Sequence, residues 1–185
     1  MSYYQSGIYF LTGSTFLHYP YFKTSQQKDI VYDRIAKLKE KYGVTVSAYS
    51  IQINHYHLIV CCDNDQLIPK IKQFIHGGVS KNYRDRFSYK YKEMWGNAKT
   101  VYIKDMNMYW GIAGYVCGNL LKHKEVNKIS DLRFNRYCSY EHFVGKYGEE
   151  KMRLLIYNVL QLDENKEDYS LDIGEMARLK PRHPS

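Results

Sequence analysis

Apolar and polar residues alternate in several short stretches of the chain, as they do in half-buried β-strands. These stretches are rich in Tyr, Ile, Val and Thr, which favour strands. The predicted strands are residues 7–16, 44–53, 56–62 and 99–104. Asn54 separates the second strand from the third and is a plausible turn residue, so these two strands are expected to form a hairpin.

Other stretches repeat apolar residues at spacings of three and four, which predicts amphipathic helices. The predicted helices are residues 26–42, 66–87 and 106–123. Gly43 is expected to end the first helix, and Asp105 to cap the third. The order β-α-β-β-α-β is that of a ferredoxin-like (RRM-like) α+β sandwich, in which an antiparallel sheet carries helices on one face.

Glycines mark two of these helices. Gly77 and Gly78 adjoin in the middle of the second helix and predict a bend or break there. The third helix contains Gly111, Gly114 and Gly118, although a helical Gly costs roughly 1 kcal/mol relative to Ala. This cost indicates close packing against another element, or movement beside it.

The chain beyond the third helix is expected to be an appendage. We assign residues 1–126 to one domain and residues 127–185 to a C-terminal extension that is partly helical. Within the extension, residues 137–148 are expected to be irregular, and residues 149–160 carry the spacing of a short helix. The charged tail is expected to be mobile, apart from a short helix near residues 173–179.

Charge and composition indicate which kinds of partner the protein is suited to bind. The 185 residues have a formal net charge of +8 and a pI of about 9.1, which favours nucleic acid before a membrane. A soluble basic protein without such a partner would show the same charge. The 20 tyrosines are compatible with stacking on bases, but Tyr also fills strands.

Cysteine usage and the absence of long apolar runs favour a reducing cytoplasm. Cys61, Cys62, Cys117 and Cys138 form no C-x-x-C pair, so neither a zinc knuckle nor a disulfide framework is expected. The chain does not open with a signal peptide, and no apolar segment reaches the length of a bilayer span. We therefore expect no membrane partner.

The sequence His55-Tyr56-His57 is the sharpest chemical feature. Residues two apart on a strand point to one face, so His55 and His57 would present two imidazoles side by side. Two neutral imidazoles form a divalent-metal site when one or two further ligands join them. For an isolated H-x-H sequence, two surface histidines are the commoner meaning.

Tyr115 and Asn119 are four residues apart in the third predicted helix, so they lie one turn apart on a similar face. The phenol could act as an attacking oxygen, and the carboxamide could bind a metal through its oxygen. Taken by itself, a Tyr-x-x-x-Asn spacing carries no signal.

Together these motifs resemble the HUH single-strand DNA transposases, named for a His-hydrophobic-His motif. Residues 46–60, VSAYSIQINHYHLIV, are similar to the family's strand–turn–strand, and residues 112–119, IAGYVCGN, to its catalytic helix. The segments GIYFLT at residues 7–12 and MW…VYI ending at residue 103 match its first and fourth strands in character. The segment RYCSY at 136–140 resembles a motif that follows the catalytic helix in the REP-associated branch.

The resemblance spans roughly residues 7–145 and implies an activity. It implies that Tyr115 is the nucleophile, that His55, His57 and Asn119 bind Mg²⁺ or Mn²⁺, and that a 5′-phosphotyrosine intermediate forms on single-stranded DNA near a hairpin. No ATP or other nucleotide cofactor is implied. It also implies a bacterial or archaeal protein associated with the nucleoid. A homodimer is expected, with the Tyr115 helix placed against the partner's histidine pair, or a monomer if the protein belongs to the REP-associated branch.

The branch within the family stays open at the sequence level. The insertion-sequence 200/605 branch usually has Gln where Asn119 stands, and the REP-associated branch usually has Pro where Leu120 stands. A mobile transposase, a domesticated REP-associated relative and a regulator that binds hairpin DNA without cutting it are therefore all considered. An RNA-recognition module lacks its aromatic strand signature here, and a two-histidine phosphoesterase would need two separate His-x-Ser/Thr motifs.

Basic side chains on and after the predicted helices are candidate contacts to DNA phosphates. These candidates are Lys70, Lys72, Lys81, Arg84, Lys122 and Lys124. A solvated helix face explains them equally well.

Overall fold

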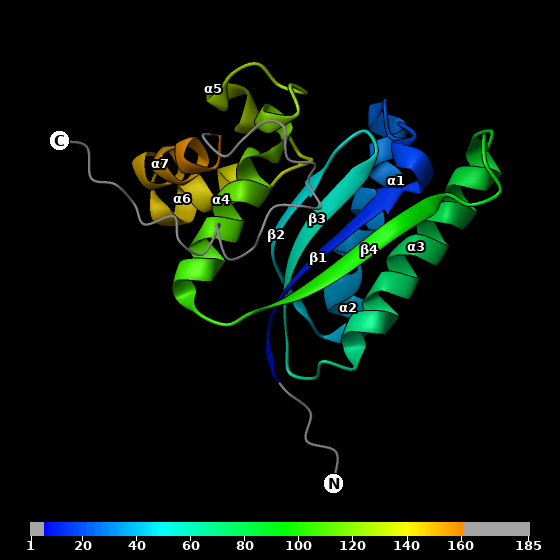
Figure 1. Cartoon of the computed structure of the whole chain (residues 1–185), viewed down its shortest axis with the longest axis horizontal. Helices are drawn as coiled ribbons and strands as arrows, with labels where there is room; N and C mark the ends of the chain where they lie inside the picture. Colours follow the sequence, from blue (N-terminus) through cyan, green and yellow to red (C-terminus); the bar gives the residue numbers. More distant parts are fainter. Residues whose placement is uncertain (1–5, 161–185) are drawn as a thin grey trace, which may run out of the picture. The chain divides into compact units, whose positions relative to one another are not determined.

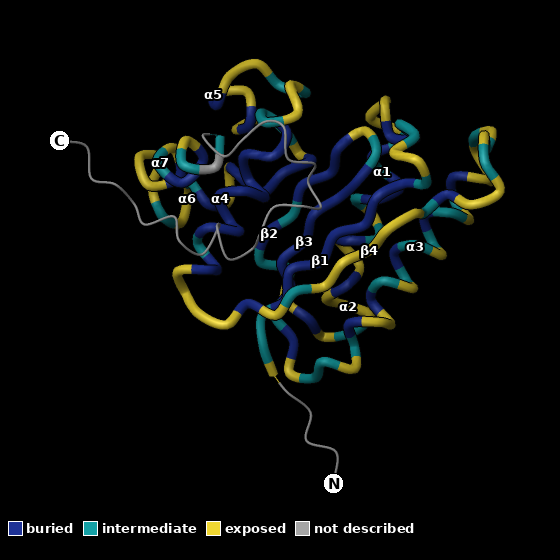
Figure 2. Tube along the Cα trace, viewed as in Figure 1, coloured by how far each residue is buried: buried dark blue, intermediate teal, exposed yellow. Residues whose placement is uncertain are grey.

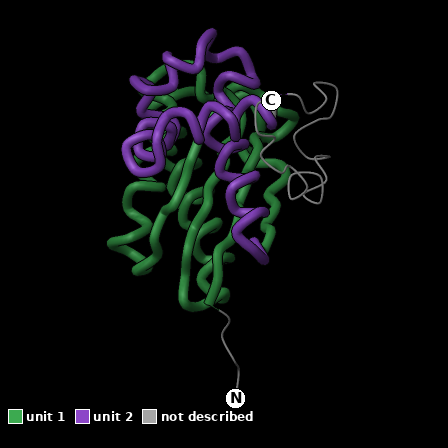
Figure 3. The backbone as a smooth tube through the Cα atoms, turned by 90° about the vertical axis from the view of Figure 1, so that its left-hand side faces the viewer, with its two compact units in different colours: residues 1–102 green, residues 103–185 purple. Residues whose placement is uncertain are grey.

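The structure is a computed structural model that describes residues 6–160, except for the side chain of Val159. The predicted mobile tail and the short helix near residues 173–179 lie outside the described residues. The chain divides into two compact units, residues 1–102 and residues 103–185 (Figure 3).

The first unit is built on a four-stranded sheet in the order β2-β3-β1-β4. Its strands are β1 (Gly7–Thr15), β2 (Thr45–Ile51), β3 (His55–Cys62) and β4 (Trp95–Ile103). Both β1 and β2 pair with β3 in antiparallel register. The central strands β1 and β3 are buried along most of their length, whereas most of the edge strand β4 is exposed (Figure 2).

Helices pack on one face of this sheet (Figure 1). They are α1 (Ser25–Ala36), the short α2 (Leu38–Tyr42) and α3 (Leu67–Arg86), and a 3₁₀ turn, η1 (Phe16–His18), follows β1. Thr24 begins α1 with a reciprocal capping box to Gln27, and Gly43 ends α2 as predicted. The predicted α+β sandwich, a four-stranded antiparallel sheet with helices packed on it, is confirmed.

Three predicted element boundaries in this unit were wrong. The first helix is divided at Lys37, the fourth strand begins at Trp95 rather than at Lys99, and α3 runs through the Gly pair as one helix. The reason for Gly78 is packing. A Cβ there would lie 2.4 Å from the Arg34 guanidinium carbon, so the Arg34 side chain of α1 packs over this glycine and would have to shift for a larger residue.

The second unit contains four helices in its described part: α4 (Met106–Lys122), α5 (Ile129–Leu132), α6 (Tyr140–Tyr147) and α7 (Glu149–Leu160). The Asp105 side chain accepts a hydrogen bond from the Met108 N–H at 2.8 Å and caps α4, as predicted. The helix that carries Tyr115 thus shares a compact unit with residues 127–160. A functional domain that ends at residue 126 stays a prediction.

Helices α4 and α7 approach each other closely at two of the predicted glycines. A Cβ on Gly114 would lie 3.1 Å from the backbone carbonyl atoms of Leu155, and a Cβ on Gly118 would lie 2.9 Å from a methyl group of Ile156. Only a residue without a side chain fits there. The prediction of close packing around these glycines is confirmed.

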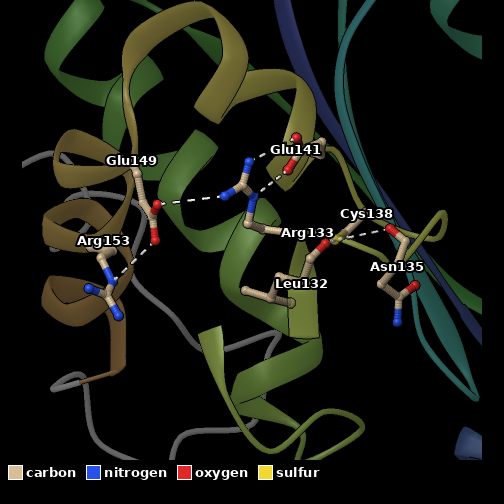
Figure 4. A network of polar contacts seen from close by, with 7 residues as sticks. All are labelled: Leu132, Arg133, Asn135, Cys138, Glu141, Glu149 and Arg153. Atoms are coloured by element: carbon tan, nitrogen blue, oxygen red, sulfur yellow. Dashed lines mark hydrogen bonds and ion pairs between the residues drawn. The ribbon is translucent and has the colours of Figure 1, made fainter. Parts of the chain in front are cut away.

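Helix α6 corrects the prediction of an irregular segment at residues 137–148. Tyr140, Phe143 and Tyr147 recur at spacings of three and four, and the first two are buried. Arg133, just after α5, also bonds Glu141 of α6 at 2.9 Å and lies 3.8 Å from Glu149 of α7 (Figure 4). Exposed ion pairs of this kind contribute little each, so the aromatic side chains explain the helix better.

All four cysteines are free thiols in the structure. Among the described helices, none combines the length and the apolar character that a membrane crossing requires.

Candidate active site

The sheet face opposite α3 carries polar side chains on three adjacent strands. His55 and His57 are two residues apart in β3 and therefore point to the same face. His57 lies opposite Thr12 of β1 and Ser50 of β2, and His55 lies opposite Ser14 of β1. Residues opposite each other in antiparallel strands share a face, so these side chains gather around the histidines.

Gln52 continues this polar face at the end of the β2–β3 hairpin. Its N–H donates to the His55 carbonyl at 2.9 Å, which places Gln52 opposite His55, one step beyond β2. We call this set the polar strip, and every member is buried. It comprises Thr12, Ser14, Ser50, Gln52, His55 and His57.

A neighbouring carboxamide sets the orientation of His55. The Asn54 amide group donates to the His18 carbonyl at 3.1 Å, so the Asn54 Oδ1 atom faces the ring of His55. Because that oxygen can only accept, the His55 Nδ1 atom at 2.7 Å must be the protonated nitrogen. The Nε2 atom of a neutral His55 therefore carries the lone pair that a metal ion requires.

The two imidazoles lie side by side. Their ring centroids are 4.9 Å apart with an angle of 69° between the planes. The His57 ring also stacks on Phe10 of β1 at 5.5 Å. His55 is 4% exposed and His57 is 1% exposed, which sets them apart from the two surface histidines that an isolated H-x-H sequence usually represents.

Tyr56, between the two histidines, points to the opposite face and meets α3. Its hydroxyl hydrogen-bonds the His76 Nε2 atom at 3.0 Å, and the His76 ring stacks on Trp95 at 4.2 Å. The indole N–H of Trp95 donates to the His76 carbonyl at 3.0 Å. Burial, with a smaller contribution from the charge of Lys72, lowers the pKa of His76 from 6.5 to about 4. His76 is therefore neutral at pH 7 and shares a hydrogen bond with the Tyr56 hydroxyl.

Sequence reasoning did not find His76. It lies beside the buried Ile75 on a helix, and no short motif marks it. Only the pairing of α3 with the underside of β3 reveals that it supports the strand with the histidine pair.

The donor set of the polar strip fits a divalent metal. No group of three or more His, Cys, Asp and Glu side chains that could hold a metal occurs among the described residues, so the histidine pair needs other donors. Carboxamide and hydroxyl oxygens suit Mg²⁺ and Mn²⁺. The Ser50 hydroxyl and both polar atoms of Gln52 are buried without a hydrogen-bond partner among the described residues, as expected of groups that await a ligand.

Tyr115 and Asn119 belong to the second unit, on α4. They are 1% and 0% exposed and lie one helical turn apart, as predicted. The Lys122 ammonium lies 5.1 Å from the centroid of the Tyr115 ring, which places a positive charge beside the phenol. Whether Asn119 binds a metal and Tyr115 attacks a phosphate stays a prediction.

The candidate DNA contacts fall into two groups. Lys70, Lys72, Lys81 and Arg84 lie on α3, which covers the sheet face opposite the polar strip. Lys122 and Lys124 lie at and just beyond the end of α4, in the same unit as Tyr115. Lys122 of the second group lies beside the Tyr115 ring and is therefore placed to contact a phosphate that approaches it.

Comparisons with known proteins give one family match and two similar solved structures. Residues 15–104 match the family described as transposase IS200 like. A search of the curated proteins gives no match.

Among solved structures, the fold is similar to a REP-associated tyrosine transposase bound to a REP hairpin. The TM-score is 0.64 at 19% identity, over 79% of this chain and 84% of that one. A candidate transposase from Deinococcus radiodurans is also similar, with a TM-score of 0.45 at 13% identity over 68% of this chain and 93% of that one. At these identities the first likeness concerns the fold, and the second carries no argument.

Proposed function

We propose that the chain is a member of the IS200-like transposases, whose family model matches residues 15–104, and that it cuts and rejoins single-stranded DNA through Tyr115. The buried pair His55–His57 carries this proposal, because the hydrogen bond from the His55 Nδ1 atom to Asn54 puts the lone pair of a neutral His55 on its Nε2 atom. A helix that presents Tyr115 and Asn119 one turn apart supplies the other half of the chemistry.

The proposed reaction is a transesterification. The Tyr115 oxygen loses its proton and attacks phosphorus, a new P–O bond forms to the tyrosine, and the bond to the 3′ oxygen breaks. The 3′ oxygen takes up a proton and leaves as a hydroxyl on the upstream fragment, while the downstream fragment stays linked to Tyr115 through its 5′ phosphate. A second 3′ hydroxyl then attacks the phosphotyrosine and releases the enzyme, so no ATP is needed.

His55, His57 and Asn119 are the residues that would hold a Mg²⁺ or Mn²⁺ ion. When bound, such an ion supplies positive charge that polarises the scissile phosphate and stabilises its developing charge. Asn54 orients His55 for that role through its 2.7 Å hydrogen bond. The Lys122 ammonium adds a fixed positive charge at the ring of the proposed nucleophile.

The proposed substrate is single-stranded DNA with a hairpin near the cut. The net charge of +8 supports an anionic partner, and the similar transposase structure contains a REP hairpin. A domesticated REP-associated protein that retains the same chemistry fits the same observations.

The experiment uses single-stranded oligonucleotides from the flanks of the gene, labelled at the 5′ or the 3′ end and incubated with Mn²⁺. Wild type is expected to give a covalent protein–DNA band on a denaturing gel, and Tyr115→Phe or EDTA to abolish it. The 3′ label should travel with the protein, because the fragment downstream of the cut stays attached through its 5′ phosphate. Tight binding of flank DNA without any cut would contradict the proposal and favour a regulator that binds hairpins without cleaving them.

A further inference from the structure

Ser50 and Gln52 face the histidine pair from β2 and its hairpin. Their polar side-chain atoms stabilise nothing by hydrogen bonding within the described residues. Ser50 lies opposite His57, and Gln52 lies opposite His55. Both are 0% exposed, and the Ser50 hydroxyl and the Gln52 carboxamide make no hydrogen bond within the described residues. Burying such groups unpaired costs free energy, and native structures rarely tolerate it without a reason.

Their position points to that reason. Directly opposed side chains in an antiparallel pair have Cβ atoms about 4.5–5.5 Å apart, so both groups adjoin the imidazoles. The neighbouring Asn54 differs from Gln52, because its side chain is hydrogen-bonded. The Asn54 side chain bonds both His18 and His55, whereas Gln52, two residues earlier, has neither its donor nor its acceptor used.

Mg²⁺ and Mn²⁺ chemistry supplies the missing partners. Mg²⁺ usually keeps several water ligands when it binds protein, and each such water donates hydrogen bonds to nearby oxygen atoms. A carboxamide suits this setting because its oxygen accepts from a water and its NH₂ group donates to a phosphate oxygen. A serine hydroxyl can accept in the same way.

We propose that Ser50 and Gln52 form the sheet side of the metal centre, where they hydrogen-bond the water ligands of the ion held by the histidines. They are positioning residues, since they act through water and do not touch the reacting phosphorus. This inference rests on the proposed function, because it presupposes that His55 and His57 bind a divalent ion.

The test measures Mn²⁺ affinity of the full chain without DNA, by calorimetry or by the electron paramagnetic resonance signal of free Mn²⁺. Gln52→Leu is expected to weaken binding by about tenfold to a hundredfold, the usual effect of losing a group that hydrogen-bonds the ligands of a metal. Ser50→Ala should weaken it in the same direction. Gln52→Glu, which retains an acceptor oxygen and adds negative charge, should bind at least as tightly as wild type.

Gln73→Leu is the matched control, because it is the same substitution at an exposed position of α3 and should leave Mn²⁺ affinity unchanged. Thermal unfolding in EDTA provides a second readout. Gln52→Leu should raise the Tm of the metal-free protein, because it removes a buried amide without partners. A residue with a purely structural role would lower the Tm and leave the Mn²⁺ affinity of the folded protein unchanged.

Two negative outcomes are distinguishable. If wild type binds Mn²⁺ and His55→Ala does not, but Gln52→Leu and Ser50→Ala bind within twofold of wild type, the role of these two residues is overturned and the proposed function stands. If wild type binds no Mn²⁺, or His55→Ala binds as well as wild type, the proposed metal centre itself fails and this inference fails with it.

Discussion

Asn54 shows how much of this site depends on single side chains. The residue is part of a turn, yet its amide links the His18 carbonyl to the His55 ring. Leu17 and His18 both have positive φ values, 51° and 52°, which non-glycine residues adopt at a cost. The strained 3₁₀ turn thus brings the His18 carbonyl within reach of Asn54 and helps to fix the protonated nitrogen of His55.

His76 gives a residue-scale prediction about pH. Its pKa is lowered from 6.5 to about 4 in the folded state, so its contribution to stability is complete above pH 6.5 and is lost as pH falls toward 4. To order of magnitude the loss is about 3 kcal/mol. Urea unfolding of the wild type in EDTA should therefore show a free energy of unfolding that rises with pH across this window. His76→Gln keeps an acceptor for Tyr56 but cannot titrate. It should reduce the pH dependence of the free energy of unfolding by the equivalent of about one proton, and an unchanged pH dependence would contradict the role of His76.

A second residue-scale prediction concerns the charge beside Tyr115. Lys122→Gln removes the ammonium that lies 5.1 Å from the phenol ring and should slow single-turnover cleavage about tenfold, or ~1.4 kcal/mol of barrier. Lys81→Gln on α3 is the control, because that helix covers the sheet face opposite the polar strip. Equal effects of the two substitutions would mean that Lys122 contributes only to overall charge.

At the scale of elements, Gly77 of α3 and Gly114 of α4 behave differently for a physical reason. A Cβ on Gly77 would meet nothing within 4 Å, whereas a Cβ on Gly114 would press on the backbone of Leu155 in α7. Gly77 therefore only lowers the helix propensity of α3, whereas Gly114 allows α4 and α7 to approach each other closely.

Paired substitutions test this difference. Gly114→Ala should destabilise the protein by about 1–3 kcal/mol through overpacking. Gly77→Ala should stabilise it by about 1 kcal/mol, because Ala is the better helix former and has open space there. Urea unfolding of both variants measures these changes, and a stabilising Gly114→Ala would contradict the close packing of α4 on α7.

The sequence predicted elements best where periodicity and a cap agreed. Helix α4 has apolar residues all along it and Asp105 before it, and its predicted start at Met106 is the observed one. Residues 140–147 lacked such a signal, because the aromatic spacing of α6 is short and begins after an irregular turn. The polar strip combines both cases. The histidine pair was visible as a sequence motif. Ser50 and Gln52 join the polar strip only because of how β2 pairs with β3, and this register could not be predicted from the sequence.

At the scale of the whole molecule, the proposed catalytic residues are divided between the two compact units. The histidine pair belongs to residues 1–102, and Tyr115 with Asn119 belongs to residues 103–185. A homodimer in which each Tyr115 serves the partner's histidines remains our proposal for how the two halves work together.

Mixing two inactive variants tests this arrangement. Tyr115→Phe and His57→Ala, unfolded and refolded together, should recover about one quarter of the wild-type sites, because half of the dimers are mixed and each has one intact site. Each variant refolded alone provides the background. No recovery would show that each chain completes its own site, as a monomeric enzyme would.

The most direct measurement identifies the residue that carries the DNA. The covalent product formed with Mn²⁺ would be digested with nuclease and trypsin, and the modified peptide fragmented in a mass spectrometer. We predict a nucleotide on the peptide from Asp105 to Lys122, attached to Tyr115 and not to Tyr109, which the same peptide contains. Attachment to any other of the 20 tyrosines, or a cut without any attachment, would contradict the central claim.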